Sequence, residues 1–136
     1  MPARPLPTVI GATENALRPL LAHALAGSLI DGYDEWVYLN SLERADDPAH
    51  VDELVVNVLK QPREVVAAAR SRLVDAGLLE ADGSLTGLGR EQLNRSRNLV
   101  SATTRALIAG IDPDAVQTTV DTLETVRSRA EDLLAG

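Results

Sequence analysis

The sequence predicts a mainly α-helical, single-domain protein of 136 residues, with a pair of helices and one short β-hairpin in its middle. Apolar residues make up 45% of the chain, but there is no Phe, one Trp and two Tyr, so Leu, Val and Ala must fill the interior. These residues recur at helical spacing in several segments. Proline and glycine separate the segments from one another.

The predicted helices begin and end at residues with matching local chemistry. We expect helices over about residues 8–30, 34–45, 49–59, 62–76 and 86–109, and a last helix that starts at residue 112. Capping side chains stand at four of the starts, where an oxygen can accept from a free backbone amide; they are Asp34, Asp47, Thr86 and Asp112. Gly77 is placed to end the fourth helix. Pro19, inside the first, indicates either an early turn or a kink.

A minimal hairpin signal follows the fourth predicted helix. Two short apolar pieces, Leu78-Leu79 and Leu85, flank the turn sequence Asp82-Gly83. Two helices joined by a short connection and followed at once by a hairpin form a winged helix-turn-helix. We therefore expect a winged helix-turn-helix lobe over residues 49–90.

The outward side of the predicted helix over residues 62–76 is basic and small. Placed at 100° intervals, Arg63, Ala67 and Arg70 fall together on a different side from the apolar residues. Arginine donates to guanine edges or phosphates, and alanine allows close approach to DNA. We expect the major groove and its phosphates to contact Lys60, Gln61, Arg63, Glu64, Ala67, Arg70 and Ser71. An ordinary solvated helix face is the alternative.

The charge is unevenly distributed along the chain. The net charge is −7, but residues 55–105 carry eight basic and five acidic side chains, a net of +3. Residues 31–54 carry eight acids against Arg44, a net of −7. An acidic body with a basic middle suits a protein that is oriented on a polyanion, and an ordinary charged surface is the alternative.

Two runs resemble the MarR (multiple-antibiotic-resistance regulator) family of transcription regulators. The run VDAGLL at residues 74–79, followed by LTGLGR at residues 85–90, is similar to that family's wing region. Residues 34–39 resemble the start of its second helix, and the last two helices resemble its dimerisation pair. The resemblance, over about residues 13–134, implies a homodimer built from residues 8–30 and 91–136.

The same resemblance implies a function. The dimer would bind a pseudo-palindromic operator in double-stranded DNA, as a repressor that a small-molecule effector releases. The family's effector cleft lies between the dimer helices and the DNA-binding lobe. The residues of this chain that we expect near such a cleft are His23, Tyr33, Trp36 and Tyr38. Core packing is the alternative for Trp36.

The predicted wing departs from the family pattern. Residues 80–84 include Glu80 and Asp82 and no Arg or Lys, whereas the family's wing carries an arginine. Its loss lowers the salt dependence of DNA binding by about one charge. Alternative backbone contacts, or pairing with acids, are expected of Arg90, Arg95 and Arg97. A winged-helix dimer with weak or no DNA binding, acting as a protein-interaction or small-molecule-sensing module, is the second functional hypothesis.

Other classes of function find little support in the sequence. There is no cysteine, and the two histidines, His23 and His50, do not stand in a metal-ligand motif, so we expect no metal and no cofactor. The sequence shows no set of nucleophile, base and orienting group, so we do not expect an enzyme. No apolar run reaches 18 residues, which predicts no membrane span and a cytoplasmic protein.

Overall fold

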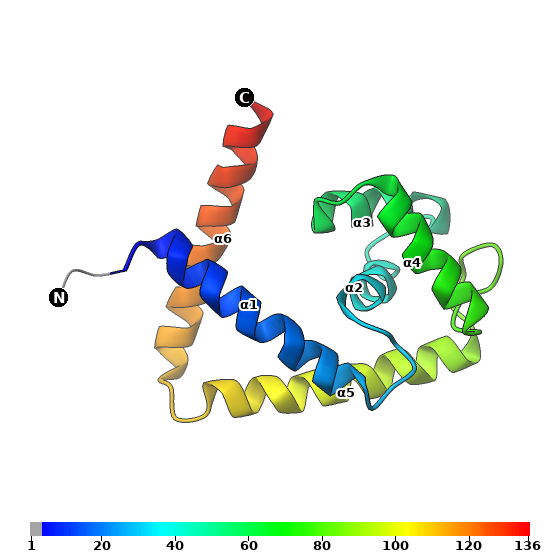
Figure 1. Ribbon diagram of the computed structural model, residues 1–136, viewed down its shortest axis with the longest axis horizontal. Helices are drawn as coiled ribbons and strands as arrows, with labels where there is room; N and C mark the ends of the chain where they lie inside the picture. Colours follow the sequence, from blue (N-terminus) through cyan, green and yellow to red (C-terminus); the bar gives the residue numbers. More distant parts are fainter. Residues whose placement is uncertain (1–3) are drawn as a thin grey trace. The chain divides into compact units, whose positions relative to one another are not determined.

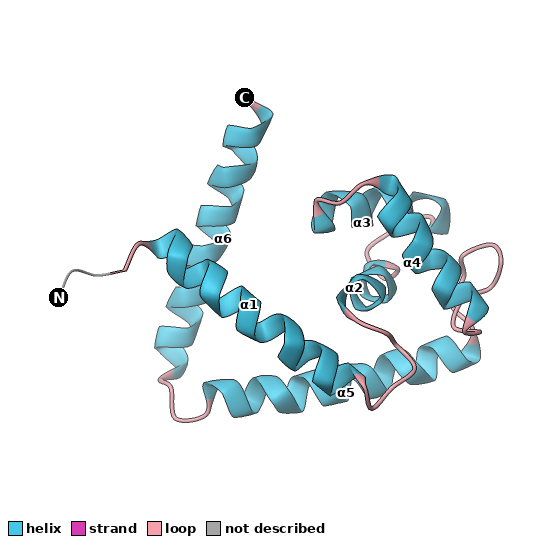
Figure 2. Cartoon of the chain, in the orientation of Figure 1, coloured by secondary structure: helices cyan, strands magenta, loops and turns pink. Residues whose placement is uncertain are grey.

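The computed structural model describes residues 4–136, and their regular elements are helices (Figures 1 and 2). The α-helices are α1 (Leu6–Leu25), α2 (Tyr33–Ser41), α3 (Val51–Leu59), α4 (Arg63–Asp75), α5 (Gly87–Ile108) and α6 (Pro113–Ala135), and a 3-10 helix, η1 (Pro48–His50), precedes α3. The chain forms two compact units that meet within α5, one ending at Ser101 and the other spanning Ala102–Gly136.

The predicted β-hairpin is absent, so the prediction of a winged helix-turn-helix with a hairpin wing was wrong. Within residues 4–136 there is no strand, and a single antiparallel bridge joins Leu79 to Leu85 (Figure 2). The amides of Leu78 and Leu79 both donate to the carbonyl of Leu73, at 2.9 and 3.3 Å. The first half of the expected hairpin is therefore used to complete the end of α4, after Gly77 turns the chain with φ 78°.

The segment that replaces the hairpin is a tight turn, which we name the acidic loop (residues 80–84). The Glu80 amide donates to the Ser84 carbonyl at 2.8 Å. One carboxylate oxygen of Asp82 accepts from the Ser84 amide at 2.9 Å and from the Ser84 hydroxyl at 2.6 Å. Those hydrogen bonds favour the ionised form and lower the pKa of Asp82. The acidic loop is thus ordered by the backbone bonds beside the Leu79–Leu85 bridge and by the Asp82 side chain, without a strand on either side.

Three of the four predicted helix caps are confirmed. Asp47 and Asp112 each accept from the amide two residues later, at 3.0 and 2.9 Å. Thr86 accepts from the amide three residues later at 2.9 Å. The prediction for Asp34 was wrong, because α2 begins one residue earlier, after Gly32, whose φ of 89° makes the turn without a side-chain cap. The predicted helix bounds agree with the observed ones within two residues, except that the first two helices end at residues 25 and 41 rather than at 30 and 45.

The core of the first unit lies among α2, α3 and α4. The fully buried apolar side chains are Leu25, Ile30, Tyr38, Leu39, Val51, Val55, Val66, Ala69, Leu73, Leu78, Leu79 and Leu93. Only Leu25, near the end of α1, is buried in that 20-residue helix. Pro19 lies inside α1, which is one continuous helix rather than two. Packing against α2 and α3 therefore holds α4 in place, together with the side chains on its exposed side.

The second unit has little interior of its own. It contains the end of α5 and the whole of α6, and no residue of α6 is buried. Leu133 and Leu134 are 83% and 80% exposed, and Val120 and Leu123 are exposed as well. Despite this apolar content, no helix in the described part of the chain is both long and apolar enough to cross a membrane.

Candidate nucleic-acid interface

Helices α3 and α4 form a helix-turn-helix. Lys60 ends α3 in the left-handed region, with φ 55°, and its amide donates to the carbonyl of Val56 at 2.9 Å. Gln61 follows, and Pro62 adopts an extended conformation that begins α4. Both helices pack on α2, and α4 lies on the outside of this group (Figure 1). The turn thus places one side of α4 toward solvent.

The predicted DNA-contacting residues lie together on this part of the fold. Six of them are exposed, and Ala67 is half-buried; the exposed ones are Lys60, Gln61, Arg63, Glu64, Arg70 and Ser71. On the opposite side of α4, Val66, Ala69 and Leu73 are fully buried. The separation of core side from outward side that the periodicity predicted is therefore present.

Arg70 is linked to the core through a carboxylate that the sequence reasoning did not connect to it. Arg70 Nη1 lies 3.4 Å from Asp52 Oδ2 on α3. The other oxygen of Asp52 accepts a hydrogen bond from the Tyr38 hydroxyl of α2 at 2.6 Å. Burial, and then this bond to a carboxylate, raise the pKa of Tyr38. Residues of α2, α3 and α4 thereby form one polar chain that ends at the outward surface.

The second outward arginine has a similar partner, at a slightly shorter distance but more exposed to solvent. Arg63 Nη2 lies 3.2 Å from Glu53 Oε1, and these side chains are 74% and 64% exposed. An ion pair in that environment contributes little to stability. Asp52 and Glu53, adjacent on α3, therefore each face one arginine of α4. Both acids lie in the first turn of α3, where the helix dipole also favours negative charge.

A third arginine of α4 stabilises the fold. Arg72 Nε donates to Glu35 Oε2 at 3.1 Å, and the Glu35 side chain is only 3% exposed. The other oxygen of Glu35 accepts from the Asp31 amide at 3.1 Å. A buried carboxylate needs such partners, because water no longer solvates it. Arg72 thus joins α4 to α2 through its ion pair with Glu35.

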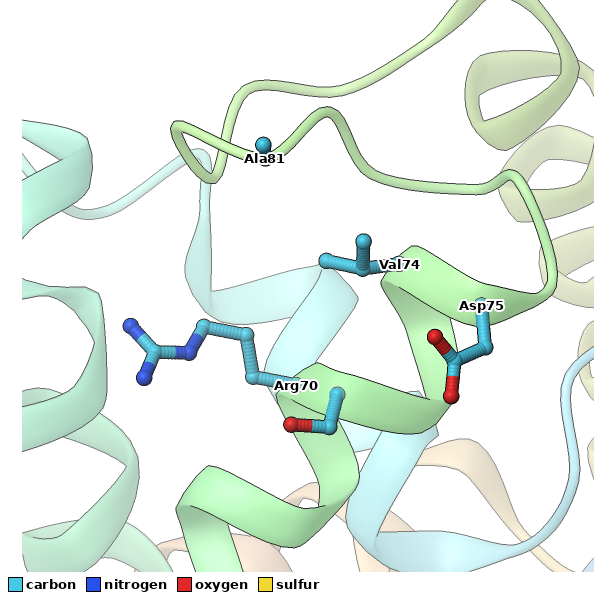
Figure 3. Close-up of a pocket in the computed structure, with 5 residues that line it drawn as sticks. Arg70, Val74, Asp75 and Ala81 are labelled. Atoms are coloured by element: carbon cyan, nitrogen blue, oxygen red, sulfur yellow. The ribbon is translucent and has the colours of Figure 1, made fainter.

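An open pocket lies beside the outward face, between α4 and the acidic loop (Figure 3). Its volume is about 320 Å³, and it is lined by Arg70, Ser71, Val74, Asp75 and Ala81. Figure 3 shows the side chain of Arg70 extending away from the carboxylate of Asp75. Val74, Asp75 and Ala81 were not among the predicted site residues. Their place there depends on how the acidic loop folds back, which the periodicity of α4 does not reveal.

Two of the three α5 arginines proposed as DNA backbone contacts are used within the first unit. Arg97 pairs with Glu43 at 2.9 Å and donates to the Asn40 side chain at 3.0 Å. The pairing lowers the pKa of Glu43. Arg95 Nε donates to the carbonyl of Gly27 at 2.6 Å. Arg90, in contrast, is exposed and forms no ion pair within residues 4–136.

The residues proposed for an effector cleft have separate environments. His23 is exposed on α1, and Tyr33 carries the guanidinium of Arg18 5.1 Å from its ring centroid. Trp36 packs against the core, and Tyr38 is fully buried. The pocket of Figure 3 contains none of these four residues. An effector cleft lined by them stays a prediction.

No group of three or more His, Cys, Asp or Glu side chains among the described residues is arranged to hold a metal ion. Comparison of the chain with protein-family models and with curated proteins finds no match. The resemblance to the MarR family therefore stays a prediction carried by the residues themselves.

Proposed function

We propose that this protein is a transcriptional regulator of the cytoplasm that binds double-stranded DNA through α3 and α4, with α4 in the major groove. The observation that carries the proposal is the outward face of α4. It presents Arg63 and Arg70 with only the small Ala67 between them, on a helix whose other side is fixed in the core. A rigid helix that begins after a short turn suits insertion between the phosphate strands.

The spacing of the two arginines fits DNA. Arg63 and Arg70 are seven residues apart in one helix, so their Cα atoms are separated by about 10 Å along its axis. That distance corresponds to about three base-pair steps of 3.4 Å. Ser71, beside Arg70, supplies a hydroxyl that donates to a base edge or a phosphate. Lys60 and Gln61, both exposed in the turn, are the residues that we propose contact phosphates at the edge of the groove.

The proposal includes a homodimer. Helix α6 runs for 23 residues without a single buried side chain, although helices in proteins owe most of their stability to tertiary packing. Its exposed apolar residues offer a surface in the second unit that a second copy would cover, and exposed Leu6, Val9 and Leu17 of α1 offer another in the first unit. A two-fold dimer binds a pseudo-palindromic operator with half-sites about one DNA turn apart. Repression, and release by a small effector, rest on the resemblance to the MarR family alone.

A helical interaction module with weak or no DNA binding is the second candidate. It is favoured by the carboxylates around the α4 surface, since Arg63 and Arg70 each face an acid of α3. Glu80 and Asp82 of the acidic loop add negative charge next to the pocket that Arg70 lines. These acids repel phosphates at close range.

The two candidates are separated by one titration of the purified wild-type protein. It is mixed with a fluorescent pool of genomic duplexes at about 50 mM salt, and the titration is repeated at rising salt concentrations. A DNA-binding regulator binds the pool at low salt. The logarithm of its binding constant then falls linearly with the logarithm of the salt concentration. Absence of binding at about 50 mM salt contradicts the proposal and favours the interaction module. Selection and sequencing of the bound duplexes then give the operator.

A further inference from the structure

Asp52 stands apart from the other surface acids of the helix-turn-helix because a buried group holds it. The Tyr38 side chain is 1% exposed, and its hydroxyl donates to Asp52 Oδ1 at 2.6 Å. A buried tyrosine has one position available to its hydroxyl, so this hydrogen bond fixes the carboxylate as well. The side chain of Asp52 is itself only 28% exposed. The other oxygen, Oδ2, is therefore presented to α4 from a fixed point.

Arg70 is the residue that this oxygen meets, at 3.4 Å from Nη1. Guanidinium has five N–H donors in one plane, and a carboxylate on one edge leaves donors on the other edges unused. Arg70 is 46% exposed, so its unused donors are accessible to a ligand. Guanine recognition needs a guanidinium held in a defined plane, whereas attraction to phosphates needs only a mobile positive charge. A fixed carboxylate partner favours guanine recognition and weakens the attraction to phosphates.

Within residues 4–136, the neighbouring pair, Glu53 and Arg63, has no buried tyrosine that holds its carboxylate. Glu53 faces Arg63 at 3.2 Å, but both of these side chains are mostly exposed. Such a pair constrains its arginine little, because solvent and salt compete with it. Asp52 and Glu53 are adjacent in the chain and carry the same charge, so they form a matched comparison.

We infer that Asp52 is a specificity-determining positioning residue: anchored by Tyr38, it orients Arg70 for a base edge and reduces the attraction of Arg70 to phosphates of any sequence. The inference rests on the proposed DNA-binding function and deepens it. It concerns the ratio of operator affinity to non-specific affinity, not whether DNA is bound.

The test compares Asp52→Asn with Glu53→Gln. The asparagine keeps the size of the side chain and an oxygen for the Tyr38 hydroxyl, but removes the charge that faces Arg70. Affinity is measured by fluorescence anisotropy for the selected operator and for a scrambled duplex, each over a salt series. For Asp52→Asn we expect about threefold to tenfold tighter binding to scrambled DNA, a salt slope steeper by about one, and a roughly tenfold lower operator-to-scrambled ratio. Glu53→Gln should change that ratio less than about twofold.

Two further variants show whether the effect passes through Arg70. Tyr38→Phe keeps the carboxylate but removes its anchor, and should lower the operator-to-scrambled ratio in the same direction. In an Arg70→Ala background, Asp52→Asn should leave the ratio unchanged. An unchanged ratio for Asp52→Asn in the otherwise wild-type protein overturns the inference while the proposed function stands. Wild-type protein that binds neither duplex overturns both, and equal effects of Asp52→Asn and Glu53→Gln overturn the role of the anchor.

Discussion

Gly89, in the first turn of α5, lies directly against the backbone carbonyl of Leu78, with no room between them for a side chain. A Cβ at position 89 would also meet the side chain of Leu85. The close approach lets the start of α5 pack on the segment that follows α4. Thr86 supports the same junction, since its hydroxyl donates to the carbonyl of Gly77 at 2.7 Å and accepts from the Gly89 amide.

Gly89→Ala should therefore destabilise the protein by about 3 kcal/mol, at the upper end for overpacking, because backbone must move to admit the methyl group. Gly87→Ala is the matched control, since a Cβ at position 87 meets nothing within 4 Å. Urea denaturation followed by circular dichroism measures both variants. Equal stabilities of the two variants would show that the contact with Leu78 relaxes at little cost.

Lys60 should be replaceable by glycine with a gain in stability. Its φ of 55° lies in the left-handed region, which costs a residue with a Cβ about 1 kcal/mol relative to glycine. Lys60→Gly is thus expected to raise the free energy of unfolding by up to about 1 kcal/mol, although the more flexible unfolded chain offsets part of this. Lys60→Ala removes the same side chain but keeps the strain, and so serves as the control. A glycine variant no more stable than the alanine variant would contradict the prediction.

Tyr38 should titrate well above the ordinary tyrosine range. In a Tyr33→Phe background it is the only tyrosine of the chain, and absorbance at 295 nm then follows it alone. Its raised pKa comes first from burial and then from the hydrogen bond to Asp52. Because the folded state holds the proton more tightly than the unfolded state, the contribution of Tyr38 to stability should be constant below about pH 10 and fall above it. Ionisation of Tyr38 near pH 10 in the folded protein would contradict this environment.

The apolar stripe of α6 should mediate self-association. Leu123→Glu places a charge among exposed apolar residues of that stripe and should shift the protein from dimer to monomer in sedimentation-velocity experiments. Thr125→Glu adds the same charge on the opposite side of α6 and should leave the dimer intact. Monomeric wild-type protein at micromolar concentration would contradict the homodimer, as would equal effects of the two substitutions.

What the sequence predicts well here is local. The caps at Asp47, Thr86 and Asp112 depend on amides two or three residues away, and the core side of α4 follows from its own periodicity. The prediction of a β-hairpin failed because the amides of Leu78 and Leu79 donate to the carbonyl of Leu73 at the end of α4. The turn sequence and its flanking apolar residues do not reveal that competing interaction.

The pairing of Asp52 with Arg70 was not predicted, for a different reason. It joins two helices whose relative rotation is set by the packing of the core, and no pattern within either helix specifies it. The same holds for the pocket, which needs the acidic loop to fold back beside α4. The sequence therefore predicted which residues face outward, but not which acids face them.

The most direct test of the account is the DNA affinity of Arg70→Ala, measured by fluorescence anisotropy on the selected operator at one fixed salt concentration. Arg129→Ala, an exposed arginine of α6, is the control for loss of one positive charge. If α4 binds the major groove through Arg70, its removal should weaken binding about tenfold or more, with the oligomeric state unchanged. Arg129→Ala should bind like the wild type. Operator affinity of Arg70→Ala equal to that of the wild type would contradict the assignment of α4 as the DNA-reading helix.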